Sequence, residues 1–119
     1  MAKLLIVGCG NATSYENYHQ CQAIIENGKI LLVDVGSRVP LALHSLDIKP
    51  SMIDAVYVSH PHADHIGGLE ELAIQRYDWR NKPENWNDTK VPYAIKLYGR
   101  DELLVDLWDH SLSGGLETI

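Results

Sequence analysis

A cluster of metal-binding side chains at the end of an apolar run is the feature that most constrains this sequence. The run 55–58 (AVYV) is followed by SHPHADHIGG, where four of six consecutive residues carry an imidazole or a carboxylate: His60, His62, Asp64 and His65. In an extended segment alternate side chains point to one side, so the first three can converge on one point. Pro61 favours that extended geometry. His65 can join them only if the chain turns at Asp64.

The residues after this cluster have helical spacing, so we expect a helix over 68–76. A strand, a ligand-bearing loop and a helix thus follow one another along the chain. Imidazole and carboxylate together suit zinc, with manganese or iron as possible substitutes. Gly67 and Gly68 each cost a helix up to ~1 kcal/mol, and their presence predicts a close approach of the backbone to the site.

Length and charge limit the classes of function. The 119 residues correspond to a single domain, and 10 basic against 16 acidic residues give a net charge of −6. This charge argues against broad binding to nucleic acid or to anionic membranes. No apolar run approaches the ~20 residues of a membrane span, the first residues do not read as a signal peptide, and two cysteines are too few for a disulfide framework. We therefore expect a cytoplasmic protein.

The first third of the chain predicts a strand followed by a hairpin. Residues 4–7 form a strand run that Gly-Cys-Gly-Asn ends, and a tight turn is favoured there over a phosphate loop because the third glycine and a following helix are missing. Residues 12–20 are polar, and we expect His19 to lie in solvent. Asn27-Gly28 predicts a hairpin between 21–26 and 29–36, with Cys21 in the core.

The remaining elements are expected as a helix over 39–46, an irregular inserted loop over 77–92, a strand over 93–98 and a helix capped by Asp101. The loop carries Trp79 and Trp86, which could form a substrate rim, a lid or a subunit contact, or could simply anchor the loop. His110, near the end of the last helix, is a further candidate ligand.

The pattern H-x-H-x-D-H resembles the signature of the metallo-β-lactamase superfamily, and SHPHADHIGGL matches it at every signature position. The resemblance implies that His60 and His62 hold one metal ion while Asp64 and His65 hold a second. It also implies an α/β fold: half of a four-layer αββα sandwich, with a mixed sheet and helices on one face. In that family an Asp-x-Gly at the position of Asp34 lies close to the metal centre, so we expect its carboxylate to orient a ligand histidine.

Three stretches, LLIVGCGNA, ILLVDVGS and LDIKPSMIDAVYVSHPHADHIGGLEEL, resemble the phosphodiesterase branch of the superfamily, which includes tRNase Z-like enzymes and cyclic-nucleotide phosphodiesterases. Two zinc ions would generate a bridging hydroxide for hydrolysis, and Asp64 is the candidate catalytic residue that orients it. The acidic chain favours a small cyclic nucleotide over a bulky RNA as the phosphodiester substrate. Alternatives are a thioester or lactam hydrolase on the same scaffold, and a catalytically incomplete fragment or assembly module.

The resembled fold is considerably longer than 119 residues, and its later loops supply another histidine, a bridging aspartate and a last histidine. We therefore expect residues 1–119 to be the N-terminal part of a single domain. Such a part would leave sheet edges and a core face exposed. It is expected to form a homo-oligomer or to pair with a complementary C-terminal half.

Overall fold

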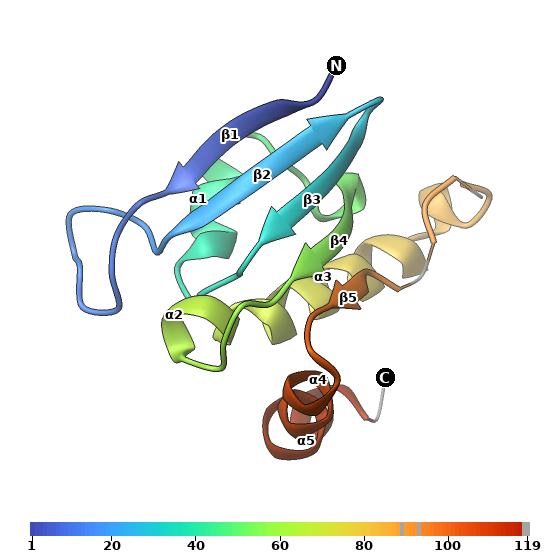
Figure 1. Cartoon of the computed structure of the whole chain (residues 1–119). Coiled ribbons are helices and arrows are strands. Elements are labelled where there is room, and N and C mark those ends of the chain that lie inside the picture. The colour runs from blue at the N-terminus through green and yellow to red at the C-terminus, as the bar shows by residue number, and fades with distance from the viewer. Residues whose placement is uncertain (89, 93, 118–119) are drawn as a thin grey trace.

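The computed structural model describes residues 1–88, 90–92 and 94–117, and contains one mixed sheet with helices packed against it (Figure 1). The strands lie side by side in chain order: β1 (Lys3–Gly8), β2 (Cys21–Glu26), β3 (Lys29–Val33), β4 (Ile53–Tyr57) and β5 (Lys96–Tyr98). The helices are α1 (Val39–Ser45), α2 (Ala63–Ile66), α3 (Leu69–Asn81), α4 (Asp101–Leu107) and α5 (Ser113–Leu116), with a π-helical turn at Trp108–Leu112 between the last two. This architecture confirms the predicted fold class.

The hairpin between β2 and β3 forms at Asn27-Gly28 as predicted. Asn27 has φ 53° and Gly28 has φ 76°, and a type I′ turn requires positive φ at both central residues. The turn sets the register that pairs Glu26 with Lys29 and Ala23 with Leu32. β1 completes an antiparallel meander with β2.

The second half of the sheet is parallel, which decides where the functional residues meet. β3 pairs in parallel with β4, and β4 with β5, with α1 and α3 lying between these strands in the chain. Parallel strands need such crossovers, and their carboxyl ends lie at one edge of the sheet. The loops that follow β3 and β4 therefore start side by side.

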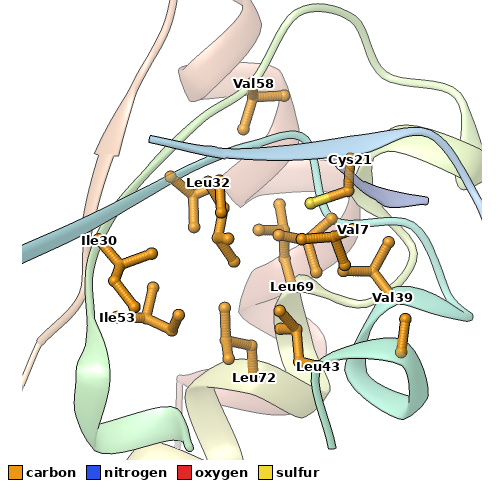
Figure 2. Packing of buried hydrophobic residues seen from close by; sticks show 14 of the residues in the cluster. Val7, Cys21, Ile30, Leu32, Val39, Leu43, Ile53, Val58, Leu69 and Leu72 are labelled. Carbon is orange, nitrogen blue, oxygen red and sulfur yellow. The ribbon is translucent and has the colours of Figure 1, made fainter. Parts of the chain in front are cut away.

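The core lies between the sheet and the helices behind it (Figure 2). Period-2 alternation directs one set of strand side chains to this face. Fully buried strand residues pack against α1 and α3, and the buried set includes Cys21, Ala23, Leu32 and Val56 from the strands with Val39, Leu43, Leu69 and Leu72 from the helices. Burial, with a further contribution from the charge of Asp34, raises the pKa of the Cys21 thiol to about 12.

The second half of the chain departs from the prediction at several boundaries. α3 runs to Asn81 rather than ending at Arg76, so the first five residues of the expected loop 77–92 are helical. Contacts with other segments hold the helix here. The buried Arg76 guanidinium donates to the carbonyl oxygens of Pro50 (3.0 Å), Pro92 (2.7 Å) and Ile53, and in the added turn the carbonyl oxygen of Trp79 accepts from the side-chain amide of Asn85 (2.7 Å). Burial lowers the pKa of Arg76 below its usual value, and the nearby charge of Asp54 offsets part of that effect.

Two further boundaries differ. The strand predicted over 93–98 is shorter in the structure, where β5 starts at Lys96. Tyr93 lies outside the described residues. Asp101 is the first residue of α4 rather than its cap, because Arg100 occupies the cap position with an extended backbone. Whether 77–92 is an insertion remains a prediction. Among the described residues, no helix is both long enough and apolar enough to cross a bilayer.

Candidate functional site

The loops that follow β3 and β4 are joined by backbone hydrogen bonds, and the predicted metal-binding residues lie on them. The Asp34 amide donates to the carbonyl oxygen of Tyr57 (2.8 Å) and the Val35 amide donates to that of His65 (2.8 Å). The Gly68 amide donates in turn to the carbonyl oxygen of Val35 (2.9 Å). These bonds hold the histidine-rich segment against the end of β3.

Glycines allow this close approach. A Cβ added at Gly36 would collide with the carbonyl oxygen of Asp64, and one added at Gly68 would collide with that of Gly36. At Gly67 the obstacle would be the carbonyl oxygen of Ala63, at 2.6 Å. The predicted close approach is confirmed at Gly68, whereas at Gly67 the shortest contact lies within its own turn and the Ser37 amide nitrogen follows at 3.2 Å.

The segment turns earlier than the sequence predicted. His62 is still extended (φ −78°, ψ 151°), but α2 begins at Ala63, so Asp64 is helical and the turn precedes it. The turn brings His65 back to His60, with ring centroids 3.8 Å apart. The His60 and His62 rings lie edge to face at 4.8 Å. His65 therefore joins the cluster as expected, although the chain turns at a different residue.

Asp34 is the buried acceptor at the centre of this edge. It directly follows β3, has a backbone φ of 63°, and is 5% exposed. One carboxylate oxygen accepts from the Ser59 amide (2.7 Å); the other accepts from the Ser59 hydroxyl (2.5 Å) and from Nδ1 of His65 (2.7 Å). The sequence placed Asp34 near a ligand histidine, and the structure shows its carboxylate bonded to His65.

These contacts determine which ring nitrogens remain available. A hydroxyl has one proton, and that of Ser59 goes to Asp34. The 3.1 Å contact between Ser59 Oγ and Nδ1 of His60 must then be donated by the histidine. His60 and His65 thus both donate from Nδ1, so each neutral ring has its lone pair on Nε2. One aspartate orients two histidines, His65 directly and His60 through a hydroxyl.

The free Nε2 of His65 lies 3.2 Å from Oδ2 of Asp64. When the ring is neutral, both atoms carry lone pairs, and a cation between them removes the repulsion. Two ligand atoms on a tetrahedral zinc lie roughly 3.4 Å apart, given bonds of about 2.0–2.2 Å. The side chains are about 12% and 13% exposed, so little solvent screens the pair. The donor set and its spacing fit a divalent metal ion.

The cluster does not form a complete metal centre by itself. In the parts of the chain that the structure describes, no three His, Cys, Asp or Glu side chains are arranged so that they could hold one metal ion. His62 is exposed, and its ring contacts that of His60 edge to face. The roles of His60, His62, Asp64 and His65 as ligands, and of Asp64 in catalysis, therefore remain proposals.

The two tryptophans lie away from this edge. α3 starts beside α2 and has Trp79 near its opposite end, while Trp86 follows beyond it (Figure 1). Trp86 is 63% exposed, and its indole N–H donates to the Asn81 carbonyl oxygen (2.9 Å). Within this chain they do not line the cluster. His110 is exposed in the π-helical turn, far along the chain from the motif.

His19 is the residue that sequence reasoning placed wrongly. It was expected in solvent but is 3% exposed, because the Gly10 and His19 backbones form an isolated bridge that returns the loop to the sheet. A Cβ at Gly36 would lie 2.5 Å from Nδ1 of His19, so the imidazole sits against the loop after β3. The period-2 spacing of His19, Cys21 and Ala23 was the signal that could have found it.

The fold resembles solved structures over most of this chain. The matches include the short form of human tRNase Z (TM-score 0.69, 23% identity, covering 92% of this chain and 39% of that one). A diphosphatase from the PhnP family matches with a TM-score of 0.66 and 22% identity, covering 91% of this chain and 45% of that one. The metallo-β-lactamase fold protein YhfI from Bacillus subtilis matches with a TM-score of 0.61 and 22% identity, covering 83% of this chain and 46% of that one. The sheet and its helices therefore form part of a metallo-β-lactamase fold.

Sequence relatives narrow this to a family. The chain is 37% identical to the Anti-Pycsar protein Apyc1 of Paenibacillus xerothermodurans over 97% of its own length and 42% of that protein's. It is 38% identical to the protein of the same name from Bacillus phage BSP38, over 96% of this chain and 41% of that protein. The chain thus spans about two fifths of the length of these curated relatives. A family model described as Anti-Pycsar protein Apyc1 matches residues 2–119, and the chain belongs to that family.

Proposed function

We propose that this chain carries the histidine-rich part of a metal-dependent phosphodiesterase that acts on cyclic nucleotides or a related small phosphodiester. The observation that supports it most is the Asp34–Ser59 network, which leaves the Nε2 lone pair of each neutral ring, His60 and His65, free to bind a metal, with that of His65 3.2 Å from the Asp64 carboxylate. Membership of the Apyc1 family agrees with an activity against cyclic nucleotide signals, as the sequence resemblance implied.

His60, His62, Asp64 and His65 would hold the metal, with two zinc ions per complete site. A bound metal pair supplies positive charge and a nucleophile of hydroxide strength at neutral pH. Asp34 keeps two imidazoles in the tautomer that offers Nε2, and Asp64 also orients the attacking group. No side-chain nucleophile is needed. The negative net charge of the chain does not oppose an anionic substrate once cations are in place.

The direct test measures metal content and hydrolysis together. The protein is stripped with a chelator, reloaded with zinc, and assayed on bis-p-nitrophenyl phosphate, on 3′,5′-cyclic nucleotides and on an acyl-glutathione. We expect phosphodiester cleavage only in the reloaded protein, and its loss in His62→Ala. His44→Ala, an exposed histidine of α1, is the matched control and should change nothing. Cleavage that survives stripping would overturn the proposal.

Two other outcomes have defined meanings. Turnover of the thioester alone would assign the site to a different hydrolase on the same scaffold. Metal binding with no hydrolysis of any substrate would favour the second candidate, a catalytically incomplete piece. Two observations support that second candidate: the chain spans about two fifths of its relatives, and the described residues contain no three-ligand group.

Asp34→Asn tests how far the network controls the metal. An amide is nearly the shape of a carboxylate but presents only one acceptor oxygen, so it cannot accept from the Ser59 amide, the Ser59 hydroxyl and Nδ1 of His65 as Asp34 does. We expect zinc affinity to fall by about 10–100-fold, the usual effect of losing a group that orients a ligand. Competition against a fluorescent chelator measures it. An unchanged affinity would mean that the histidines are oriented without Asp34.

The open face of the sheet supports a proposal about partners. β1, β2, β4 and β5 expose Leu4, Ile6, Ile24, Tyr57 and Tyr98 on the side away from the helices. Burial of such a face gains roughly 25 cal/mol per Å², and an exposed apolar patch of this kind marks an interface. We propose that a complementary second half of the fold covers this face, and that the chain alone self-associates through it.

A further inference from the structure

His19 is a buried imidazole whose hydrogen bonds are missing from the described residues. Both ring nitrogens are inaccessible to solvent, and neither has a hydrogen-bond partner among the residues that the structure describes. A buried polar group without a partner is costly. An apolar side chain of similar size would fill the same space without burying an unpaired polar group. A role for the imidazole nitrogens would explain why a histidine is found here.

A candidate acceptor follows from the geometry of Gly36. A Cβ built on Gly36 would collide with the carbonyl oxygen of Asp64 and with Nδ1 of His19. Both atoms therefore flank the same point in space, on the side of Gly36 that has no side chain. The Nδ1 atom of His19 and the main-chain oxygen of Asp64 each lie within 2.5 Å of that point, so they are near neighbours although no hydrogen bond joins them.

That oxygen has lost its helical donor. In a longer helix, the carbonyl of Asp64 would accept from the amide four residues on, which is that of Gly68. The Gly68 amide donates instead to the carbonyl oxygen of Val35 (2.9 Å). A buried donor without a partner thus lies beside a main-chain acceptor whose regular partner has been diverted.

We propose that His19 is a positioning residue for the metal-binding loop, donating from Nδ1–H to one buried water that in turn donates to the carbonyl oxygen of Asp64. This water-mediated bond would hold the peptide group between Asp64 and His65. The carbonyl oxygen of His65 already accepts from the Val35 amide (2.8 Å). The direction of both side chains toward the metal then depends on a residue from the loop between β1 and β2. The inference rests on the proposed function only in assigning a metal to those side chains.

Three substitutions separate the two ring nitrogens. The Nδ2 amide of asparagine falls where Nδ1 of histidine lies, whereas the amide of glutamine falls nearer Nε2, and leucine has neither. We expect zinc affinity to stay within about 3-fold of the parent in His19→Asn and to fall about 10–100-fold in His19→Gln and His19→Leu. His44→Asn, on the exposed side of α1, should leave the affinity unchanged. A structural role alone would lower thermal stability in all three variants with no such ranking of zinc affinity.

A spectroscopic measurement on the parent chain needs no variant to fold. The long-range ¹H–¹⁵N spectrum of ¹⁵N-labelled protein reports which ring nitrogen of each histidine carries the proton, and His19→Asn assigns the His19 signals. We expect the Nδ1–H form; the Nε2–H form would overturn the inference. If the parent binds no zinc, the proposed function fails, while the tautomer still decides the hydrogen bond. If the parent binds zinc and the three variants bind it equally, the inference alone fails.

Discussion

The two faces of the sheet carry similar side chains but differ in what covers them. Towards the helices, Ala23 and Leu32 are completely buried and pair across β2 and β3. On the opposite face, Ile24 and Leu31 pair between the same strands, yet Ile24 is 38% exposed. The cross-strand registers extend this second face into two rows: Leu4, Ile24, Leu31, Ala55 and Lys96, and Ile6, Gln22, Val33, Tyr57 and Tyr98.

This difference agrees with the proposal that a further layer covers the open face. Strands that alternate between apolar and polar residues have one wet face, whereas strands that are apolar on both faces are buried on both. The strands here are closer to the second kind: most residues of the two rows are apolar, and Gln22 and Lys96 are the polar members. The helices cover one face, whereas Leu4, Ile6, Ile24, Tyr57 and Tyr98 on the other face are 38% to 67% exposed. The motif lies at the edge shared by both faces, so completion of the second layer would bring new side chains next to it.

The largest effect is expected on the covered face. Leu32→Ala removes a fully buried side chain and leaves a cavity beneath α1 and α3. The free energy of unfolding should fall by about 3 kcal/mol. Urea titration followed by circular dichroism measures it, with Leu41→Ala, 62% exposed on α1, as the matched control. Equal effects at the two leucines would contradict the assignment of the covered face as the core.

A smaller effect on folding is expected on the open face. Ile6→Thr combined with Tyr57→Thr keeps β-propensity but reduces the apolar surface. The unfolding free energy of the monomer should change by less than about 1 kcal/mol, while self-association is lost. Sedimentation velocity over a range of concentrations measures the association. A parent chain that is monomeric at every concentration would remove the reason for expecting an interface here.

The smallest effect is on chemistry rather than stability, and it uses the two cysteines. Cys9 is exposed, whereas Cys21 points into the covered face and has a thiol pKa of about 12. At pH 8 only about one Cys21 thiol in 10⁴ is ionised, and the thiolate is the reactive form. A thiol reagent should label Cys9 rapidly, Cys21 only after unfolding, and neither rapidly in Cys9→Ser. Rapid labelling of both would mean that the covered face opens readily.

Prediction from the sequence succeeded where a signal is local. The hairpin depends on two residues that accept positive φ, and its turn appeared where Asn27-Gly28 predicted it. It failed where distant groups decide the outcome. The end of α3 was misplaced because buried contacts of Arg76 with Pro50, Ile53 and Pro92 hold the helix against the sheet.

The candidate site divides in the same way. The spacing of the histidines and Asp64 in the sequence was enough to predict a cluster, and the two strands before it were enough to bring Asp34 to the same edge. The orientation of the rings was not predictable. It depends on the Ser59 hydroxyl, which passes the effect of Asp34 to His60, and on a turn at Ala63 that side-chain parity alone did not indicate.

By itself, then, the sequence determined the composition of this site and the order of the elements that carry it, because ligand spacing, turn residues and apolar alternation act over a few residues. Only the tertiary structure decided that His19 lies buried behind Gly36 and that one face of the sheet stays open. Both depend on which backbones approach one another across the sheet, and no short-range preference of the chain specifies that.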